Sequence, residues 1–159
     1  MADVILDGYV TVWLVPTIPN IAAPVAATIT AGTDISMSLT PDGLAGFEST
    51  TNWVDNSALG STFNTKLPGT VDFGDMSLTF KWQAGSDTLF NMLVFGYQTN
   101  VVIRRRILRS TAALAGQLVE VYPIACGQYT PNNVERNTLT KFRIPIGPLQ
   151  EPNLRAIVA

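Results

Sequence analysis

The fold is decided by one stretch of sequence, VDFGDMSLTFKWQAGSDTLFNMLVFG, which spans residues 71–96. Over Val71–Trp82 apolar side chains alternate with polar ones, and this period of two predicts a half-buried β-strand. The apolar set is Met76, Leu78, Phe80 and Trp82, and the polar set is Ser77, Thr79 and Lys81. We therefore expect this strand to cover a core with one face only.

The second half of the same stretch changes to a helical period. Gly85-Ser86-Asp87 ends the alternation, and apolar residues then recur at helical spacing until Gly96: Leu89, Phe90, Leu93 and Val94. Ser86 is the expected N-cap, and Gly96 is the expected residue after the last turn. One short helix set among strands brings no obvious chemistry, so the pattern indicates assembly rather than catalysis.

Most of the remaining sequence is typical of strands and turns. The expected strands are residues 8–15, 33–39, 47–54, 100–109, 118–125 and 138–146. Residues 8–15 are apolar on both faces, as in a strand buried on both sides or between subunits. Pro41-Asp42-Gly43 predicts a turn, and Pro123 predicts that its strand lies at an edge or contains a bulge.

Two segments are expected to extend from a single domain that covers residues 1–159. Residues 56–70 are rich in Ser, Thr, Asn and Gly and have no clear periodicity. Connections of about 15 residues are longer than most and tend to be functional. Residues 147–159 contain Pro148 and Pro152 and are predicted to form an extended C-terminal arm.

The composition predicts a subunit that needs partners. Charged residues make up only 14% of the 159 residues, well below the usual quarter. A compact monomer of this mass exposes roughly 7,800 Å², which leaves about one charge per 350 Å². Because obligate interfaces are apolar and poor in charge, burial against other subunits explains this shortage. The alternative is a monomer with a large core and a polar, uncharged exterior.

The residues needed for catalysis or metal binding are missing from the sequence. There is no histidine, which removes the commonest general base and the commonest metal ligand. Asp72 and Asp75 flank Phe73-Gly74 and are interpreted as a solvated turn, and no phosphate-binding glycine loop occurs. Cys126 is alone and is expected to be a buried thiol in a strand. We therefore predict no enzyme, no cofactor and no metal.

Membranes and a global affinity for nucleic acid are also not expected. Prolines interrupt the apolar region 9–31, and the start of the chain does not resemble a signal peptide, so we predict a protein made in a cytoplasm. The net charge of −2 gives no basic field.

One cluster of positive charge stands out at Arg104, Arg105, Arg106 and Arg109. On a strand Arg104 and Arg106 would face one way and the other two the opposite way, so they form no single basic patch. We expect edge-strand residues that form ion pairs with carboxylates, including those of a neighbouring subunit. The alternative is a contact with phosphate or nucleic acid.

The order of these segments resembles the major tail tube proteins of long-tailed bacteriophages of the siphophage type, over nearly the whole chain. The resemblance is carried by VTVWLV at 10–15, AGTDIS at 31–36, the aromatic and polar strand 47–55, STFNTKLPGT at 61–70, SLTF at 77–80, FG at 95–96 and VVIRR at 101–105. It implies an antiparallel β-sandwich or half-barrel with one flanking helix, whose subunits form hexameric rings that share an inner β-barrel. Stacked rings would form a tail tube that conducts DNA into the host.

The resemblance also implies roles for particular residues. Loop residues Leu59, Phe63 and Leu67 are expected to bridge stacked rings, together with the C-terminal arm. Polar residues that DNA would pass without sticking are expected in the lumen: Glu48, Thr50, Asn52, Ser77, Thr79 and Lys81.

Partners implied by the resemblance are other copies of the chain and the tape measure, tail terminator and baseplate or tip proteins. The virion tail would be its location, and the host bacterial cytoplasm its place of synthesis. The alternative function is a β-sandwich interaction module, either a virion decoration protein or a carbohydrate-binding domain that stacks sugars on Trp53 or Trp82.

Overall fold

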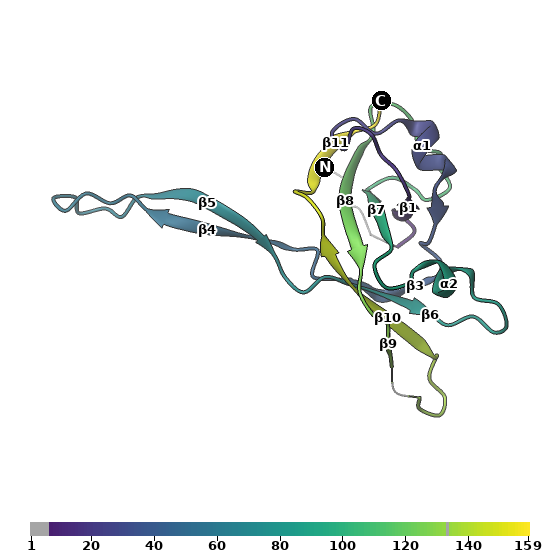
Figure 1. The fold of residues 1–159 in the computed structure, drawn as a ribbon. Coiled ribbons are helices and arrows are strands. Elements are labelled where there is room, and N and C mark those ends of the chain that lie inside the picture. The colour runs from purple at the N-terminus through teal and green to yellow at the C-terminus, as the bar shows by residue number, and fades with distance from the viewer. Residues whose placement is uncertain (1–6, 133) are drawn as a thin grey trace.

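A curled antiparallel sheet with two short helices on its flanks forms the body of the protein, and a long ribbon projects from it (Figure 1). The computed structural model describes residues 7–132 and 134–159. The strands in this part are β1 (Val10–Val15), β2 (Thr33–Asp34), β3 (Leu39–Ala45), β4 (Ser49–Asp55), β5 (Lys66–Phe73), β6 (Ser77–Lys81), β7 (Gln98–Arg105), β8 (Leu118–Cys126), β9 (Thr130–Pro131), β10 (Lys141–Pro148) and β11 (Asn153–Ile157). The helices are α1 (Ala26–Ala31) and α2 (Thr88–Met92).

The main sheet has the strand order β2-β1-β7-β8-β10-β6-β3, with β11 added to β8 and β9 added to β10. All of these pairings are antiparallel. β10 joins the two halves, because Lys141–Pro145 pairs with β6 and Ile146–Pro148 pairs with β8. The predicted mainly-β half-barrel is therefore confirmed.

Two apolar cores explain why β1 is apolar on both faces. Val12 and Leu14 belong to the core inside the curl, whereas Trp13 and Val15 belong to a second core on the other side. The inner core also holds Met76, Leu78 and Phe80, with Trp82 packed against it, as the alternation predicts. The outer core lies against α1 and the chain end, where Ile29, Ala156 and Val158 are buried.

Aromatic side chains pack α2 against the sheet. Phe90 of α2 lies 5.1 Å from Trp82 and 5.3 Å from Phe142, measured between ring centroids. The N-cap is Asp87 rather than the predicted Ser86, since the Asp87 carboxylate accepts a hydrogen bond from the Phe90 N–H. The helix ends at Met92, so Val94 lies beyond it and is exposed, contrary to the helical pattern.

The predicted turn at Pro41-Asp42-Gly43 is wrong, because these residues lie within β3. The strand keeps its pairing with β6 by a register shift between Leu39 and Leu44. A bulge of this kind absorbs a proline without loss of the strand, and β3 is an edge of the sheet, where proline is tolerated.

Pro123 also differs from its prediction, because it lies in β8 in the middle of the sheet and is buried. It occupies the point where the partner of β8 changes from β11, at Val121, to β10, at Ile124. The Pro123 carbonyl accepts from Leu149 N–H on that side. In a strand the N–H and the carbonyl of one residue point to the same side. The missing N–H of Pro123 would therefore face the position where the partner of β8 changes, and no ladder hydrogen bond is lost.

The C-terminal segment is extended but folds back onto its own subunit. β11 pairs with β8, and Ala156 and Val158 are buried in the outer core. Ile157 and Ala159 donate backbone hydrogen bonds to Ala22 and Pro24. In β10, the strand that precedes β11, buried and exposed side chains alternate as predicted, and the buried residues are Phe142, Ile144 and Ile146.

Candidate assembly surfaces

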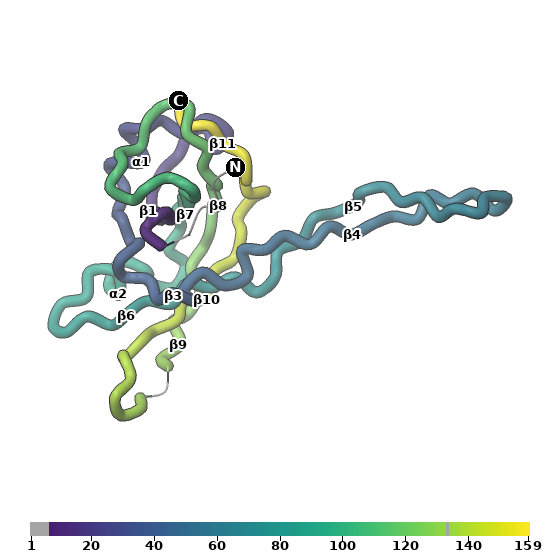
Figure 2. Tube along the Cα trace, turned by 180° about the vertical axis from the view of Figure 1, so that it is seen from behind, coloured from purple at the N-terminus to yellow at the C-terminus, as the bar shows by residue number. Residues whose placement is uncertain are grey.

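The most prominent surface feature is a long two-stranded ribbon. β3 leads into β4 and β5 leads into β6, so one continuous hairpin is part of the sheet at its base and free beyond it. We call residues 49–73 the arm. β4 and β5 pair only with each other, and both views show the arm pointing away from the body (Figures 1 and 2). The expected loop 56–70 is its tip, of which residues 66–70 are already strand β5.

The arm is exposed on both faces and carries apolar side chains. Trp53 is 60% exposed, Phe63 is 73% exposed, and Leu59 is completely exposed. The whole chain exposes 10193 Å², nearly a third more than the roughly 7,800 Å² of a compact monomer. A two-stranded ribbon is marginally stable alone, and apolar patches of this kind mark interaction sites. The arm is therefore a candidate interaction surface.

Glycine sets the direction of the arm where it leaves the body. Gly46 has a φ of +76°, and a Cβ placed there would lie 2.4 Å from the Asp75 carbonyl oxygen. Only glycine fits such a close approach of two backbones. Gly74, on the opposite strand of the same connection, has no atom within 4 Å of a Cβ position. This connection also interrupts the predicted strand 71–82, since β5 ends at Phe73 and β6 begins at Ser77.

One face of the arm is polar near its base. Asn52 Nδ2 donates to Thr70 Oγ1 at 3.0 Å and to Asp72 Oδ2 at 2.6 Å, and Thr50 lies opposite Asp72 in the register. Residues of the opposite face turn inward at the base, where Phe73 meets the Tyr122 ring edge-on at 6.1 Å. The structure thus brings together Thr50 and Asn52 of the predicted lumen set, and Glu48 is exposed just before them.

The other predicted lumen residues lie on β6 and are less accessible. Ser77 is buried, and its Oγ has no hydrogen-bond partner within the described chain. Thr79 is half-buried. Lys81 is half-buried and its Nζ donates to the Met37 carbonyl at 3.2 Å. The lumen assignment of these residues stays a prediction, because a lumen exists only in an assembled ring.

Three of the four clustered arginines have partners inside their own subunit. Arg105 Nε lies 2.8 Å from Glu120 Oε1, and Arg109 Nη2 lies 3.0 Å from Asp34 Oδ2. Arg104 is completely buried. Arg106 is exposed and adopts a φ of +67° after the end of β7. Ion pairs of these arginines with a neighbouring subunit stay a prediction, and Arg104 has no exposed surface for one.

The buried Arg104 organises the connection between β7 and β8. Its guanidinium donates to the carbonyls of Thr111 and Ala112 at 2.7 and 3.0 Å, and to Gln117 Oε1 at 2.9 Å. The ring of Trp13 lies 5.0 Å below its charge centre. Burial lowers the pKa of Arg104, and the more distant charge of Asp34 opposes this. Sequence alternation could not predict this role, because the acceptors come from a loop.

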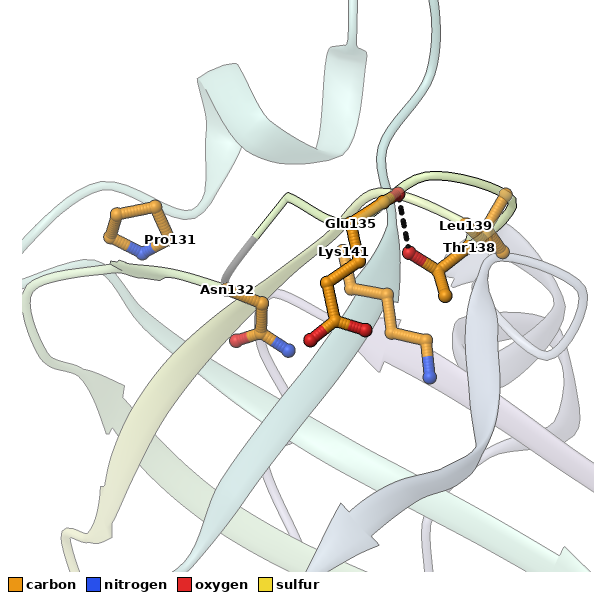
Figure 3. A pocket seen from close by; sticks show the side chains of 6 residues that line it. All are labelled: Pro131, Asn132, Glu135, Thr138, Leu139 and Lys141. Carbon is orange, nitrogen blue, oxygen red and sulfur yellow. Dashed lines mark hydrogen bonds between the residues drawn. The ribbon is translucent and has the colours of Figure 1, made fainter.

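Chemical sites are not apparent in the part of the chain that the structure describes. A shallow opening of about 490 Å³ beside β9 and β10 is lined by Pro131, Asn132, Glu135, Thr138, Leu139 and Lys141 (Figure 3). Its one drawn hydrogen bond runs from Thr138 Oγ1 to the Glu135 backbone carbonyl. No cluster of three potential metal ligands occurs among residues 7–132 and 134–159, and no helix there is long and apolar enough to span a bilayer.

Burial confirms the expectation for the single cysteine. Cys126 ends β8 inside the inner core, where desolvation raises the pKa of its thiol to about 11. Burial likewise raises the pKa of Tyr122, and the neighbouring Glu120 carboxylate adds to the shift. Both groups are buried in the inner core, which is consistent with a structural role.

The fold and its surfaces are those of a structural protein with exposed strands. A sequence profile of the family described as phage tail tube protein matches residues 1–159. The chain therefore belongs to the phage tail tube protein family, whose members have no enzymatic activity. No curated protein is similar enough to count as a relative.

Two solved structures share the fold. One is a chain of the anti-feeding prophage baseplate, determined by cryo-EM with six-fold symmetry, with a TM-score of 0.64, 14% identity and 98% of each chain covered. The other comes from the sheath/tube terminator of the extracellular contractile injection system PVC in its extended state, with a TM-score of 0.64 and 12% identity, covering 98% of this chain and 99% of that chain. Both belong to contractile systems, so the likeness does not single out siphophage tails.

Proposed function

We propose that six copies of this chain close into a ring, and that rings stack into a tail tube whose bore carries DNA during ejection. The observation that carries this proposal is the arm, an extended ribbon of the sheet with apolar side chains that the described part of its own subunit does not cover. A tube subunit must contact both its neighbours in the ring and copies in the next ring, and an arm of this length supplies the second contact.

An open sheet edge supplies the contact within the ring. Among the described strands β3 pairs with β6 alone, so its outer edge is open in this part of the chain, and such edges invite another strand. The other margin ends in the two-residue strand β2, which covers the edge of β1 together with Ile35, whose N–H donates to the Val12 carbonyl at 2.9 Å. A contact between two unlike surfaces closes into a ring when its rotation allows. The groove of about 1020 Å³ between the arm base and residues 148–155 is our candidate for the second surface.

The tip of the arm supplies the contact between rings in this proposal. The side chains of Leu59, Phe63 and Leu67 are exposed there, although the Leu67 backbone pairs with Val54 in the ribbon. A single tip should bind the next ring only weakly. The six tips of one ring act together, however, and linked contacts raise the overall affinity between rings without any new interaction.

The bore is proposed to be lined by the polar face of the arm base, with Glu48, Thr50, Asn52 and Asp72. Hydroxyl, amide and carboxylate groups do not neutralise phosphates, so DNA passes without strong binding. Thr79 and Lys81 of β6 extend this lining, whereas Ser77, being buried in the single chain, is not included.

Other assignments follow from the same proposal. The tube would contact the tape measure, tail terminator and baseplate or tip proteins, and it would be made in the host bacterial cytoplasm. A tail of the siphophage type is our proposal from the sequence resemblance, and a tube inside a contractile sheath is the alternative that the two structural neighbours favour. Purified tails examined for a sheath protein distinguish the two.

The test of the proposed function is assembly of the purified chain. Size exclusion over a range of concentrations and negative-stain microscopy, with and without fragments of native tails as seeds, should show rings or tubes with six-fold end views. The double variant Leu59→Ser/Phe63→Ser should give single rings but no long tubes. Dispersed monomers of the unaltered chain at every concentration, even with seeds, would contradict the proposal.

A further inference from the structure

We infer that the apolar tip of the arm docks beside α2 of a second copy in the next ring; this rests on the proposed stacking of rings. The receiving surface is a groove of about 410 Å³, which we call the α2 groove. It is lined by Phe90, Asn91, Leu93, Val94, Phe95, Gln128 and Tyr129.

The α2 groove presents apolar side chains that nothing in their own subunit covers. Phe95 is 75% exposed and Val94 is 56% exposed. They lie in a turn that is held in place by hydrogen bonds rather than left loose. Tyr97 N–H donates to the Val94 carbonyl at 3.0 Å, and Gly96 N–H donates to the Cys126 carbonyl at 2.8 Å. A preformed turn with an outward Phe suits a docking surface, because little ordering is needed on binding.

The α2 groove and the arm lie at opposite ends of the continuous hairpin that includes β6. β6 runs away from the arm to Lys81, and α2 follows it after a short connection, so α2 lies at the end from which the arm does not project (Figures 1 and 2). In a tube built from rings of one orientation, the contact between rings joins two different surfaces of the subunit. An arm that leaves one end must then meet the opposite end of a subunit in the next ring.

The chemistry of the two surfaces matches. The end loop of the tip, residues 56–65, contains no charged residue, although Asp55 and Lys66 flank it. The lining of the α2 groove contains no charged residue either, whereas the chain has 22 charged residues among 159. Docking Leu59 and Phe63 in the α2 groove buries apolar surface without removing any charged group of the groove lining or the end loop from water. The amides of Asn91 and Gln128 at the groove offer hydrogen-bond partners to the Ser, Thr and Asn side chains of the tip.

Cysteine cross-linking of assembled tubes tests this inference. A Phe63→Cys/Phe95→Cys variant, treated with a short bismaleimide, should give a ladder of covalent oligomers on denaturing gels, because each chain links to one copy above and one below. Each single variant should give dimers at most. Native Cys126 is buried and should not react. A matched control, Phe63→Cys/Leu139→Cys, places the second thiol at an exposed residue of the β9–β10 protrusion and should give no ladder.

The outcomes separate the docking site from the proposed function. Tubes of the Phe63→Cys/Phe95→Cys variant without a ladder, or an equal ladder from the Leu139→Cys control, would overturn the inference while the tube function stands. If the unaltered chain forms no tubes, the proposed function itself fails. If only the variants fail to form tubes, the two single variants are assembled together in the presence of unaltered chain. A mixed Phe63→Cys and Phe95→Cys dimer in those tubes supports the site, and its absence overturns it.

Discussion

The body and the arm are built from the same kind of strand, but they are stabilised in different ways. In β7, six of eight residues are buried, whereas in β4 only Thr51 is even half-buried. The body thus has cores of its own on both sides of β1, β7 and β8. The arm has cross-strand pairs but no core. We conclude that the body can fold alone, while the arm reaches its full stability only against other subunits.

The two regions also differ in how they treat polar groups. The body buries the charge of Arg104 and pairs its two terminal nitrogens with loop carbonyls, while Nε has no hydrogen-bond partner within the described chain. The arm keeps its polar groups in solvent, where Asn52 and Asp72 form an exposed hydrogen bond. Buried networks fix a unique conformation, and exposed ones contribute little to stability. Mutations in the body should therefore change the free energy of unfolding, and mutations in the arm should change assembly.

The sharpest test compares two phenylalanines. Phe142 is completely buried and stacks on Phe80 at 5.3 Å, so Phe142→Ala should lower the free energy of unfolding by about 3–5 kcal/mol. Phe63→Ala in the arm should change it by less than about 0.5 kcal/mol, yet reduce the yield and length of the tubes. Urea titration of the unassembled subunit gives the first quantity, and microscopy gives the second. A large loss of subunit stability from Phe63→Ala would show that the arm is part of the body's folding unit.

A second comparison uses two adjacent arginines. Arg104→Met removes the donors to the Thr111 and Ala112 carbonyls, and each buried acceptor left unpaired costs about 1–3 kcal/mol. We expect a loss of at least about 2 kcal/mol. Arg105→Met breaks the partly exposed pair with Glu120 and should cost about 0.2–1 kcal/mol. Equal losses in urea titrations of the two variants would mean that the buried guanidinium is not the anchor of the 106–117 loop.

The connection between body and arm is tested by two glycines. Gly46→Ala introduces a Cβ into contact with the Asp75 backbone at a positive φ, and strain of this kind costs about 1–3 kcal/mol. The strain can be relieved only by moving the arm. We therefore expect the variant to lose most of its tube yield, while the melting temperature of the subunit falls by only a small amount. Gly74→Ala, with open space at its Cβ position, is the control and should assemble normally. Normal tubes from Gly46→Ala would mean that the arm direction is not fixed before assembly.

The sequence predicts those parts of the fold in which burial of one or both faces of a strand sets the pattern of apolar residues. The alternation around Met76–Trp82 and the two apolar faces of β1 follow directly from burial, which is why their orientation is correct. β5 was missed between Lys66 and Thr70, because Pro68 and Gly69 have low strand propensity. Its pairing with β4 is a non-local interaction that overrides this propensity.

The candidate surfaces were predictable only in part. Leu59, Phe63 and Leu67 stand out as apolar residues in a polar segment, and all three are exposed. Val94 was assigned to the helix by its spacing, although α2 ends two residues earlier. The signal that could have indicated its exposure is Phe95-Gly96, an aromatic residue before a glycine with positive φ. The burial of Arg104 depends on where a loop carbonyl lies, which periodicity does not encode.

The smallest expected effect concerns pH and two aspartates. Partial burial raises the pKa of Asp34, but hydrogen bonds from Ser36 and the charge of Arg109 outweigh it and leave the pKa below its ordinary value. A lowered pKa in the folded state stabilises the body above pH about 4, and this stability is lost as the pH falls through the folded pKa. Because the Arg109 pair is exposed, Asp34→Asn should cost about 0.2–1 kcal/mol at pH 7 and flatten the acid limb of a stability profile. In the arm, hydrogen bonds from Ser57 lower the pKa of the fully exposed Asp55, yet Asp55→Asn should leave the body's profile unchanged. A shift of that profile by Asp55→Asn would mean that body and arm unfold as one unit.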